Sequence, residues 1–176
     1  MKPLKTEIAF ATPWFEVVAK TMRPDEEPYY SLRLPDYAAV VALTEDQRLL
    51  LVRQYRPALE RYTLELPSGL VDEGETPAES AARELIEETG YAAARVEVLG
   101  PMFTDTGRLA NRMWGCFAPS VRRVEHRAPE GGIELLEYSL PEFWRAAADG
   151  QFDHALHLAI VMIAVLRGKL QMEPLE

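Results

Sequence analysis

The sequence is poor in cysteine and histidine, the side chains that most often build disulfides and zinc sites. Cys116 is the only cysteine among 176 residues, so the chain can form neither an internal disulfide nor a thiolate metal cage. It lies in the apolar stretch MWGCFA, which favours a buried structural thiol over a catalytic one. His126, His154 and His157 are not at metal-ligand spacing with one another, and we expect structural roles for them.

A long apolar run and an excess of positive charge are also missing. The longest apolar region, residues 155–166, is shorter than the roughly 20 residues needed to span a bilayer. The N-terminus, MKPLKTEIAFATPW, lacks the apolar core of a signal peptide. We therefore expect a cytoplasmic protein. The net charge of −9 disfavours nucleic acid and anionic membranes as partners, because both require a basic surface. Metal ions could still reverse the charge locally for an anionic substrate.

The composition, 48% hydrophobic and 27% charged, is that of an ordinary globular protein without repeats or a Gly/Ser linker. Residues 1–36 contain short apolar runs broken by five prolines, which predicts an N-terminal β lobe or arm. Residues 37–176 form the expected main domain. Its pattern predicts an α/β (α+β) fold with a mixed sheet. The expected strands are 37–43, 49–54, 62–66, 96–99, 113–118 and 135–140, and the expected later helices are 141–148 and 154–167.

One further helix is predicted between Thr76 and Gly90. Thr76 can cap its N-terminus, Pro77 suits the first helical position and Glu79 completes a capping box. Gly90 is a natural C-terminal stop.

Three glutamates, Glu84, Glu87 and Glu88, share one side of this helix at spacings i, i+3 and i+4. Like charges at these spacings repel, and the helix dipole disfavours anions in the last turn. Only Arg83 offers a cation nearby. Hard oxygen ligands of this kind suit Mg²⁺ or Mn²⁺. Local physics leaves a solvated acidic face as an equal alternative.

The longer pattern around this helix decides between the two. Gly69, Glu75, Arg83-Glu84-Leu85, Glu87-Glu88 and Gly90 follow the spacing G-x5-E-x7-R-E-U-x-E-E-x-G-U, where U is aliphatic. This segment resembles the Nudix box, with Tyr91 as a departure at the last aliphatic position. The resemblance implies an α/β/α sandwich with a mixed sheet and hydrolysis of a nucleoside diphosphate linked to another moiety.

The resemblance also implies roles for individual residues. Glu84 and Glu88 would be the principal Mg²⁺ ligands, with Mn²⁺ as a substitute, and Glu87 would assist. The backbone carbonyl of Ser68 would supply a further oxygen. Arg83 would orient a box glutamate and Glu75 would brace the loop. Gly69 and Gly90 would have conformational roles.

Sequence outside the box resembles the ADP-ribose pyrophosphatase and nucleotide-sugar branch of the family. The matching segments are Gln54-Tyr55-Arg56 and the Glu65-Leu66-Pro67-Ser68-Gly69 entry to the box. Arg56 suits bidentate phosphate contact, although pairing with a surface acid is the alternative. Glu65 would contact substrate or hold the loop. Arg108, with Asn111 and Arg112, would line the substrate cleft.

One departure concerns the turn 104–107, where Thr106 occupies the position at which this branch usually has proline. The departure leaves nucleoside diphosphate sugars other than ADP-ribose open as substrates.

Hydrolysis also requires a base, which in this branch is often a carboxylate on a loop before a late strand. The segment APEGGIELLEY fits such a loop. Glu134 is the preferred candidate, with Glu130 second, and solvated loop acids are the alternative reading of both. Together, Glu134, Glu87 and Glu88 make up the predicted catalytic set.

The sequence therefore predicts an enzyme that cleaves the pyrophosphate of a nucleoside diphosphate sugar into a nucleoside monophosphate and a sugar phosphate. The family resemblance suggests a homodimer in which residues 1–36 cross to the partner. Trp14, Tyr29 or Tyr30 would then stack on a base, although packing is the commoner role of such aromatics. The alternative function is a nucleotide sensor of the same fold without turnover.

Overall fold

The computed structural model describes residues 2–172 of the chain. Two sheets and three helices make up the fold of these described residues. The strands are β1 Lys5–Ala11, β2 Glu16–Thr21, β3 Tyr29–Arg33, β4 Tyr37–Thr44, β5 Leu49–Arg56, β6 Arg61–Glu65, β7 Ser68–Leu70, β8 Tyr91–Ala92, β9 Glu97–Phe103, β10 Arg112–Arg123 and β11 Ile133–Tyr138. The helices are α1 Pro77–Thr89, α2 Leu140–Ala148 and α3 Ala155–Leu166.

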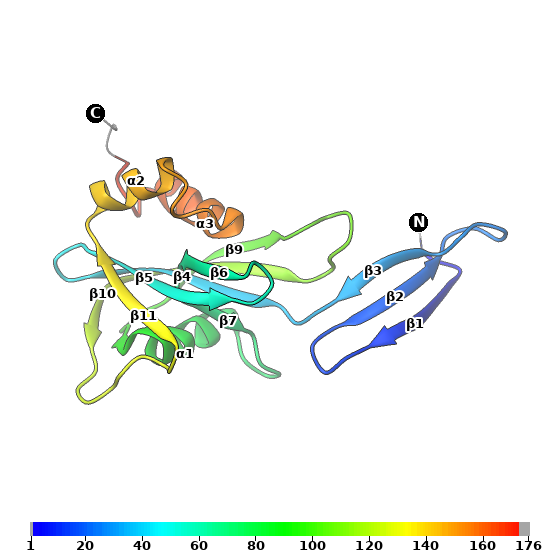
Figure 1. The fold of residues 1–176 in the computed structure, drawn as a ribbon, viewed down its shortest axis with the longest axis horizontal. Helices are drawn as coiled ribbons and strands as arrows, with labels where there is room; N and C mark the ends of the chain where they lie inside the picture. The colour runs from blue at the N-terminus through cyan, green and yellow to red at the C-terminus, as the bar shows by residue number, and fades with distance from the viewer. Residues whose placement is uncertain (1, 173–176) are drawn as a thin grey trace.

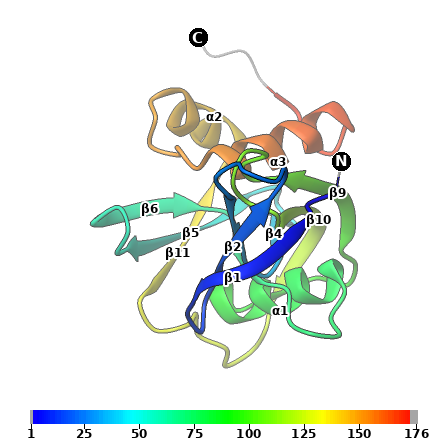
Figure 2. The same cartoon turned by 90° about the vertical axis from the view of Figure 1, so that its right-hand side faces the viewer.

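The larger sheet is mixed and is covered by helices on both faces. Its main path runs β11-β5-β4-β10-β8, and β6, β7 and β9 pair with β5, β4 and β10. β10 is parallel to β4, whereas the other pairings are antiparallel. Helix α1 lies on one face and α2 and α3 lie on the other (Figure 2). This α/β/α arrangement with a mixed sheet confirms the predicted fold.

Strand β4 and the first half of β5 are buried on both faces, which explains why their sequences, YAAVVAL and LLLV, are continuous apolar runs. Their alternate side chains contribute to two separate cores. Ala38, Val40 and Leu50 pack toward α1, whereas Val41 and Leu51 belong to the core beneath α2 and α3.

The N-terminal arm, β1–β3, is a three-stranded antiparallel sheet that projects away from the main body (Figure 1). The predicted β lobe is therefore present. The arm joins the body where the Leu32 N–H donates to the Arg108 carbonyl at 2.8 Å. All seven residues of β1 are exposed, so neither face of this strand is covered within the described chain.

The predicted element boundaries require corrections near the C-terminus. The strand expected at 135–140 ends at Tyr138, because Ser139 caps α2 and forms a capping box with Glu142. The helix expected at 154–167 is α3, flanked by His154 at its N-cap and Arg167 at its C-cap. Within residues 2–172, no helix has the length and apolar content needed to cross a membrane.

Candidate active site

The acidic helix forms as the sequence predicts. The Thr76 side chain accepts from the Glu79 N–H, the Glu79 carboxylate accepts from the Thr76 N–H, and Gly90 ends α1 with φ of 73°. Ala81 and Leu85 are buried against the sheet, which fixes the rotation of the helix. The caps and the apolar side therefore determine where the glutamates of α1 point.

Arg83 organises the loop and the helix into one unit. Its guanidinium donates to both oxygens of Glu75, at 2.9 and 3.1 Å, and to the Leu70 carbonyl at 3.0 Å. The same group reaches Glu84 at 2.7 Å and Glu87 at 3.1 Å. Arg83 therefore contacts three glutamates of the box, and Glu75 is held between the loop and the helix. These contacts are consistent with an orienting role for Arg83 and a bracing role for Glu75.

Glu88 is the most deeply buried carboxylate of the helix, with 5% of its surface exposed. Its Oε2 accepts from the Ser68 N–H at 2.8 Å. The pKa of Glu88 is raised to about 8, mainly by burial and also by the charge of Glu84, against the opposing Ser68 hydrogen bond. Burial also raises the pKa of Glu84. A divalent cation would offset this buried negative charge, so the oxygen-rich donor set fits such an ion.

Gly69 provides space for Glu84. A Cβ at position 69 would overlap the Glu84 carboxylate, and Gly69 is not in a left-handed conformation. Its role is therefore close approach between β7 and α1, whereas the predicted conformational role applies to Gly90.

A pocket of about 610 Å³ adjoins these carboxylates. Ser68 connects the two, because it lines the pocket and its N–H contacts Glu88. The pocket has an apolar wall that includes Leu34, Leu59 and Met113. Its polar lining residues are Arg56, Arg61, Thr63, Glu65, Ser68, Thr104, Asn111, Asp153, His154 and His157.

Arg56 and Glu65 form an ion pair inside this pocket. The Arg56 Nε and Nη2 donate to the two Glu65 oxygens at 2.7 and 2.5 Å, and Thr63 Oγ1 donates to Glu65 Oε1 at 2.6 Å. Burial of Glu65, 1% exposed, opposes ionisation, but these hydrogen bonds outweigh it and lower its pKa to about 2. Arg56 therefore pairs with an acid, but with a buried one rather than with the surface acid considered as the alternative.

The two candidate bases occupy different surroundings. Glu134 on β11 pairs with Arg53 on β5 at 2.9 Å. Glu130 donates its N–H to the Glu87 carbonyl at 2.9 Å and lines a pocket of about 470 Å³ with Glu87. Its charge contributes to the raised pKa of Glu84. Of the two, Glu130 lies beside the acidic cluster.

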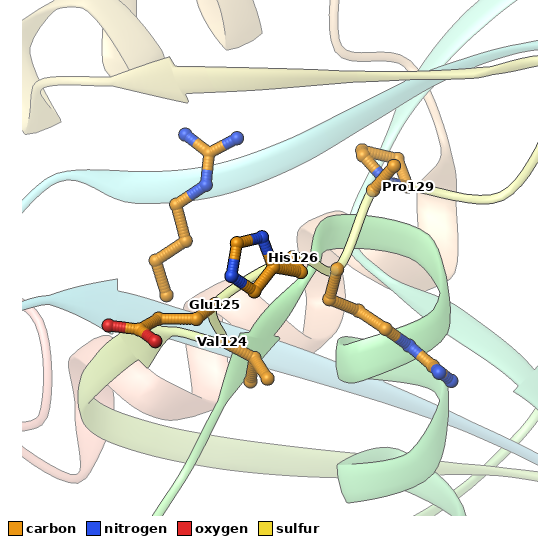
Figure 3. Close-up of a pocket in the computed structure, with 7 residues that line it drawn as sticks. Val124, Glu125, His126 and Pro129 are labelled. Carbon is orange, nitrogen blue, oxygen red and sulfur yellow. The ribbon is translucent and has the colours of Figure 1, made fainter.

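Another pocket follows the loop 123–129, where Figure 3 shows His126 and Pro129 on the chain that passes α1. The loop is tied to the end of that helix, because the Val124 N–H donates to the Gly90 carbonyl at 2.8 Å. Glu125 is the only carboxylate lining this pocket. The pocket therefore lacks the carboxylate cluster found on α1.

The remaining candidates are distributed around the large pocket. Arg108 stacks on the Tyr29 ring of the arm, with 4.5 Å from Cζ to the ring centroid, whereas Asn111 lines the pocket. Arg108 is absent from that lining. Cys116 is buried, and burial raises its pKa to about 12, as expected for a structural thiol.

Sequence reasoning missed the contribution of α3 to the pocket. His154 and His157, three positions apart at the start of α3, both line it beside Glu65. Their i, i+3 spacing signals a shared helix face, but nothing local to residues 154–157 indicates that Glu65 faces them.

Comparison with known proteins agrees with this geometry. A family model described as the NUDIX domain matches residues 33–154. The chain belongs to the Nudix family. Members of this family use divalent metals in general. The residues of the predicted box are those that the structure brings together at α1 and its entry loop.

Individual relatives span different parts of this Nudix chain. It is 33% identical over 114 residues to the methanol dehydrogenase activator of Bacillus methanolicus, covering 63% of this chain and 62% of that protein. It is 40% identical over 73 residues to an ADP-ribose pyrophosphatase of Bacillus subtilis, covering 42% and 40%. The chain thus matches less than two thirds of the length of either relative.

Two longer matches support the fold and the family. An ADP-ribose pyrophosphatase of Mycobacterium tuberculosis is 33% identical over 144 residues, covering 78% of this chain and 70% of that protein. A solved structure titled ADP compounds hydrolase superposes with a TM-score of 0.79 over 97% of this chain and 98% of that one. Its 22% sequence identity makes this a likeness of fold.

Proposed function

We propose that this Nudix protein hydrolyses the pyrophosphate bond of ADP-ribose or a related nucleoside diphosphate sugar. Water attacks one phosphorus and the bridging P–O bond breaks, giving a nucleoside monophosphate and a sugar phosphate. The observation that carries the proposal is the junction at Ser68, where the buried carboxylate of Glu88 meets the large pocket. A diphosphate could therefore lie at the carboxylates while the rest of the substrate occupies the pocket. The names of two pyrophosphatase relatives agree with this substrate class.

The proposed metal ligands are Glu84, Glu87, Glu88 and the carbonyl oxygen of Ser68, with Mg²⁺ as the preferred ion and Mn²⁺ as a substitute. A bound divalent cation supplies charge neutralisation of the phosphoryl oxygens and acidifies water. Arg83 holds Glu84 and Glu87 in place through its hydrogen bonds. The support for this assignment is that Glu84 lies close enough to the buried Glu88 to raise its pKa, while Arg83 donates to both Glu84 and Glu87.

The proton of the attacking water requires a carboxylate acceptor. We propose Glu130 ahead of Glu134 for this role, because Glu130 adjoins Glu87 and Glu134 is paired with Arg53. Glu130→Gln should lower kcat by about 10²-fold or more, with Glu134→Gln as the matched comparison. A larger loss in Glu134→Gln would return the role to that residue.

In the substrate pocket, Arg56 remains a candidate for diphosphate contact, with its Glu65 pair presenting the guanidinium at a fixed angle. Glu65 then acts mainly by holding Arg56. Arg108 lies outside the pocket lining and stacks on Tyr29 of the arm, so it is not proposed as a direct substrate contact within one chain.

The arm itself, residues 1–36, is proposed to mediate a homodimer. Support comes from the apolar side chains that it exposes, which are Leu4, Ile8, Phe10, Trp14, Tyr29 and Tyr30. Light scattering should show a dimer for the native chain and a monomer for the double variant Ile8→Lys/Phe10→Lys. Leu166→Lys, an exposed apolar position on α3, is the control. A monomeric native chain at micromolar concentration contradicts the dimer.

The deciding experiment for the reaction is a hydrolysis panel in Mg²⁺. ADP-ribose, ADP-glucose, GDP-mannose and dinucleoside polyphosphates are compared by release of nucleoside monophosphate. Fastest release of AMP from ADP-ribose supports the ADP-ribose assignment, and faster cleavage of another sugar directs attention to the turn around Thr106. Tight binding without cleavage of any compound would contradict the proposal and favour the sensor function.

A further inference from the structure

The floor of the large pocket contains a polar cluster outside the proposed metal centre. Glu65, His154 and His157 each offer one ligand atom, and these atoms lie within 4.8 Å of one another. The two imidazole rings stack with centroids 3.7 Å apart and planes 12° from parallel. All three residues line the pocket.

The hydrogen bonds define which imidazole nitrogen carries a proton. His157 Nδ1 accepts from the Leu66 N–H at 3.1 Å, and His154 Nδ1 accepts from the His157 N–H at 3.3 Å. Burial lowers the pKa of His157 to about 3, so the ring is neutral and its single proton lies on Nε2. This buried Nε2–H has no hydrogen-bond partner among residues 2–172. Buried donors in native proteins normally find a partner, so the donor is suited to a ligand atom.

Glu65 supplies the complementary acceptor. Its Oε1 already receives two hydrogen bonds, from Arg56 and Thr63, whereas its Oε2 receives one from Arg56. A carboxylate oxygen can accept two, so Oε2 retains acceptor capacity. Because both residues line the pocket, its lining contains a buried donor without a partner and an acceptor with remaining capacity.

The charges around the cluster disfavour a metal ion there. Arg56 already pairs with the Glu65 carboxylate, so an added cation would face a fixed positive charge. The cluster also lies at the N-terminus of α3, where the helix dipole disfavours cations. A neutral group with one acceptor and one donor can bond to both His157 Nε2–H and Glu65 Oε2. Such a group is not repelled by the Arg56 charge or by the helix dipole.

We propose that His157 and Glu65, with His154 packed beside them, recognise a neutral substrate group that both accepts and donates a hydrogen bond. Two parts of a nucleoside diphosphate sugar have this chemistry, a sugar hydroxyl and the N1/N6 edge of adenine. The identity of the ligand rests on the proposed function, whereas the donor–acceptor site follows from the cluster itself. His157 is thereby a specificity-determining residue.

The test uses asparagine variants that keep the structural bonds of each histidine. Asparagine can retain an acceptor near the Nδ1 position and is a good N-cap residue, so His157→Asn and His154→Asn remove mainly the Nε2 side. His126→Asn is the matched control, because His126 lies in a turn with φ of 60°, which asparagine tolerates. Thermal melts identify any variant that does not fold. If one of the two pocket variants fails to fold, the other is used for the test.

The probes are ADP-ribose, the analogue carrying 2-deoxyribose as its terminal sugar, and IDP-ribose. KM is measured for each in Mg²⁺, and Kd is measured separately by calorimetry with EDTA present, so that no hydrolysis occurs. The native protein should prefer ADP-ribose over one analogue by about tenfold, and His157→Asn should remove that preference. Loss of preference over the deoxy analogue assigns the hydroxyl, and loss over IDP-ribose assigns the adenine edge. His126→Asn should retain the native ratios.

Equal changes for all three probes in both pocket variants, or no change in their ratios, overturn the inference. Stoichiometric Zn²⁺ binding that both asparagine variants abolish also overturns it. Altered binding ratios without any hydrolysis would leave the inference standing while the proposed reaction failed. Hydrolysis with unchanged ratios would do the opposite.

Discussion

Two buried glutamates near the same pocket have opposite electrostatics. Glu65 is 1% exposed and Glu88 is 5% exposed, so burial alone does not distinguish them. Glu65 receives two guanidinium bonds and a hydroxyl bond, which lower its pKa to about 2. Burial raises the pKa of Glu88 to about 8, with the nearby Glu84 carboxylate adding to the rise, because one backbone N–H and the more distant charge of Arg56 do not outweigh these effects. The difference teaches that partners, rather than depth, decide the charge of a buried acid here.

The comparison separates the two halves of the proposed site. Glu65 has its counter-cation in the protein, so the pocket floor is electrostatically complete and can recognise neutral groups. Among residues 2–172, no cationic side chain hydrogen-bonds to Glu88, and its carboxylate is suited to a divalent ion. The predictions below test whether this division holds.

The largest effect is expected for Glu88→Gln. Removing this charge should lower kcat by about 10³-fold, because metal-based charge stabilisation contributes several kcal/mol. Steady-state kinetics across Mg²⁺ concentrations provide the measurement. Glu79→Gln is the matched control on the same helix, since glutamine can still serve in its capping box. Equal losses in both variants would assign the effect to the helix rather than to the metal.

Arg56→Ala tests the other buried glutamate. It leaves Glu65 buried without its cation and should lower the free energy of unfolding by about 3 kcal/mol in urea denaturation at pH 7. Because the Glu65 pKa is depressed, this difference should persist above pH 4.5 and shrink as the pH falls through 4.5 toward about 2. Arg53→Ala breaks the exposed pair with Glu134 and should cost less than about 1 kcal/mol. Similar losses of unfolding free energy in Arg56→Ala and Arg53→Ala would contradict the difference between the buried and the exposed ion pair.

Gly69→Ala tests the space that Glu84 requires. The added Cβ collides with the Glu84 carboxylate, so Mg²⁺ affinity should fall by about 10- to 100-fold in calorimetry. Gly131→Ala is the control, because a Cβ there meets nothing within 4 Å and its φ is not left-handed. Unchanged affinity in Gly69→Ala would show that Glu84 is not a ligand in this position.

The smallest predicted effect is the pH dependence of metal binding. The raised pKa of Glu88 means that the metal-free protein keeps a proton there, and its contribution to stability is full below pH 4.5 and is lost as the pH rises through about 8. Metal must displace that proton, so the apparent Mg²⁺ affinity should rise by about tenfold per pH unit below pH 8. Calorimetry in buffers of different ionisation enthalpy counts the released protons. A flat profile in the native chain, matching Glu88→Gln, would argue against Glu88 as the titrating ligand.

The sequence predicts the acidic helix closely because its signals are local. Thr76, Glu79 and Gly90 act within a few residues of the ends that they define, and all three act in the structure as expected. The predicted boundary near Ser139 is wrong although the sequence contains the same kind of signal, Ser139 followed by Glu142. The strand-like pattern of LLEYSL continues across this boundary, and hydrophobic alternation alone does not show at which residue a strand ends and a helix begins.

Contacts between distant segments could not be predicted in this way. The pairing of Arg56 with Glu65 depends on the register of β5 against β6, and the approach of His157 to Leu66 joins positions 91 residues apart. The requirement for glycine at position 69 is also non-local, because a side chain there would collide with Glu84 on α1. A motif names these residues, whereas their physical roles follow from packing.

The most direct test of the account is to measure the titration of both glutamates by carbon-detected NMR of the side-chain carboxyl groups. We predict that without metal Glu88 titrates near pH 8 and Glu65 stays ionised down to about pH 2. Saturating Mg²⁺ should move the Glu88 transition to lower pH and leave Glu65 unchanged. Titration of both groups together near pH 4.5, or a Mg²⁺-dependent shift of Glu65 alone, would contradict the account.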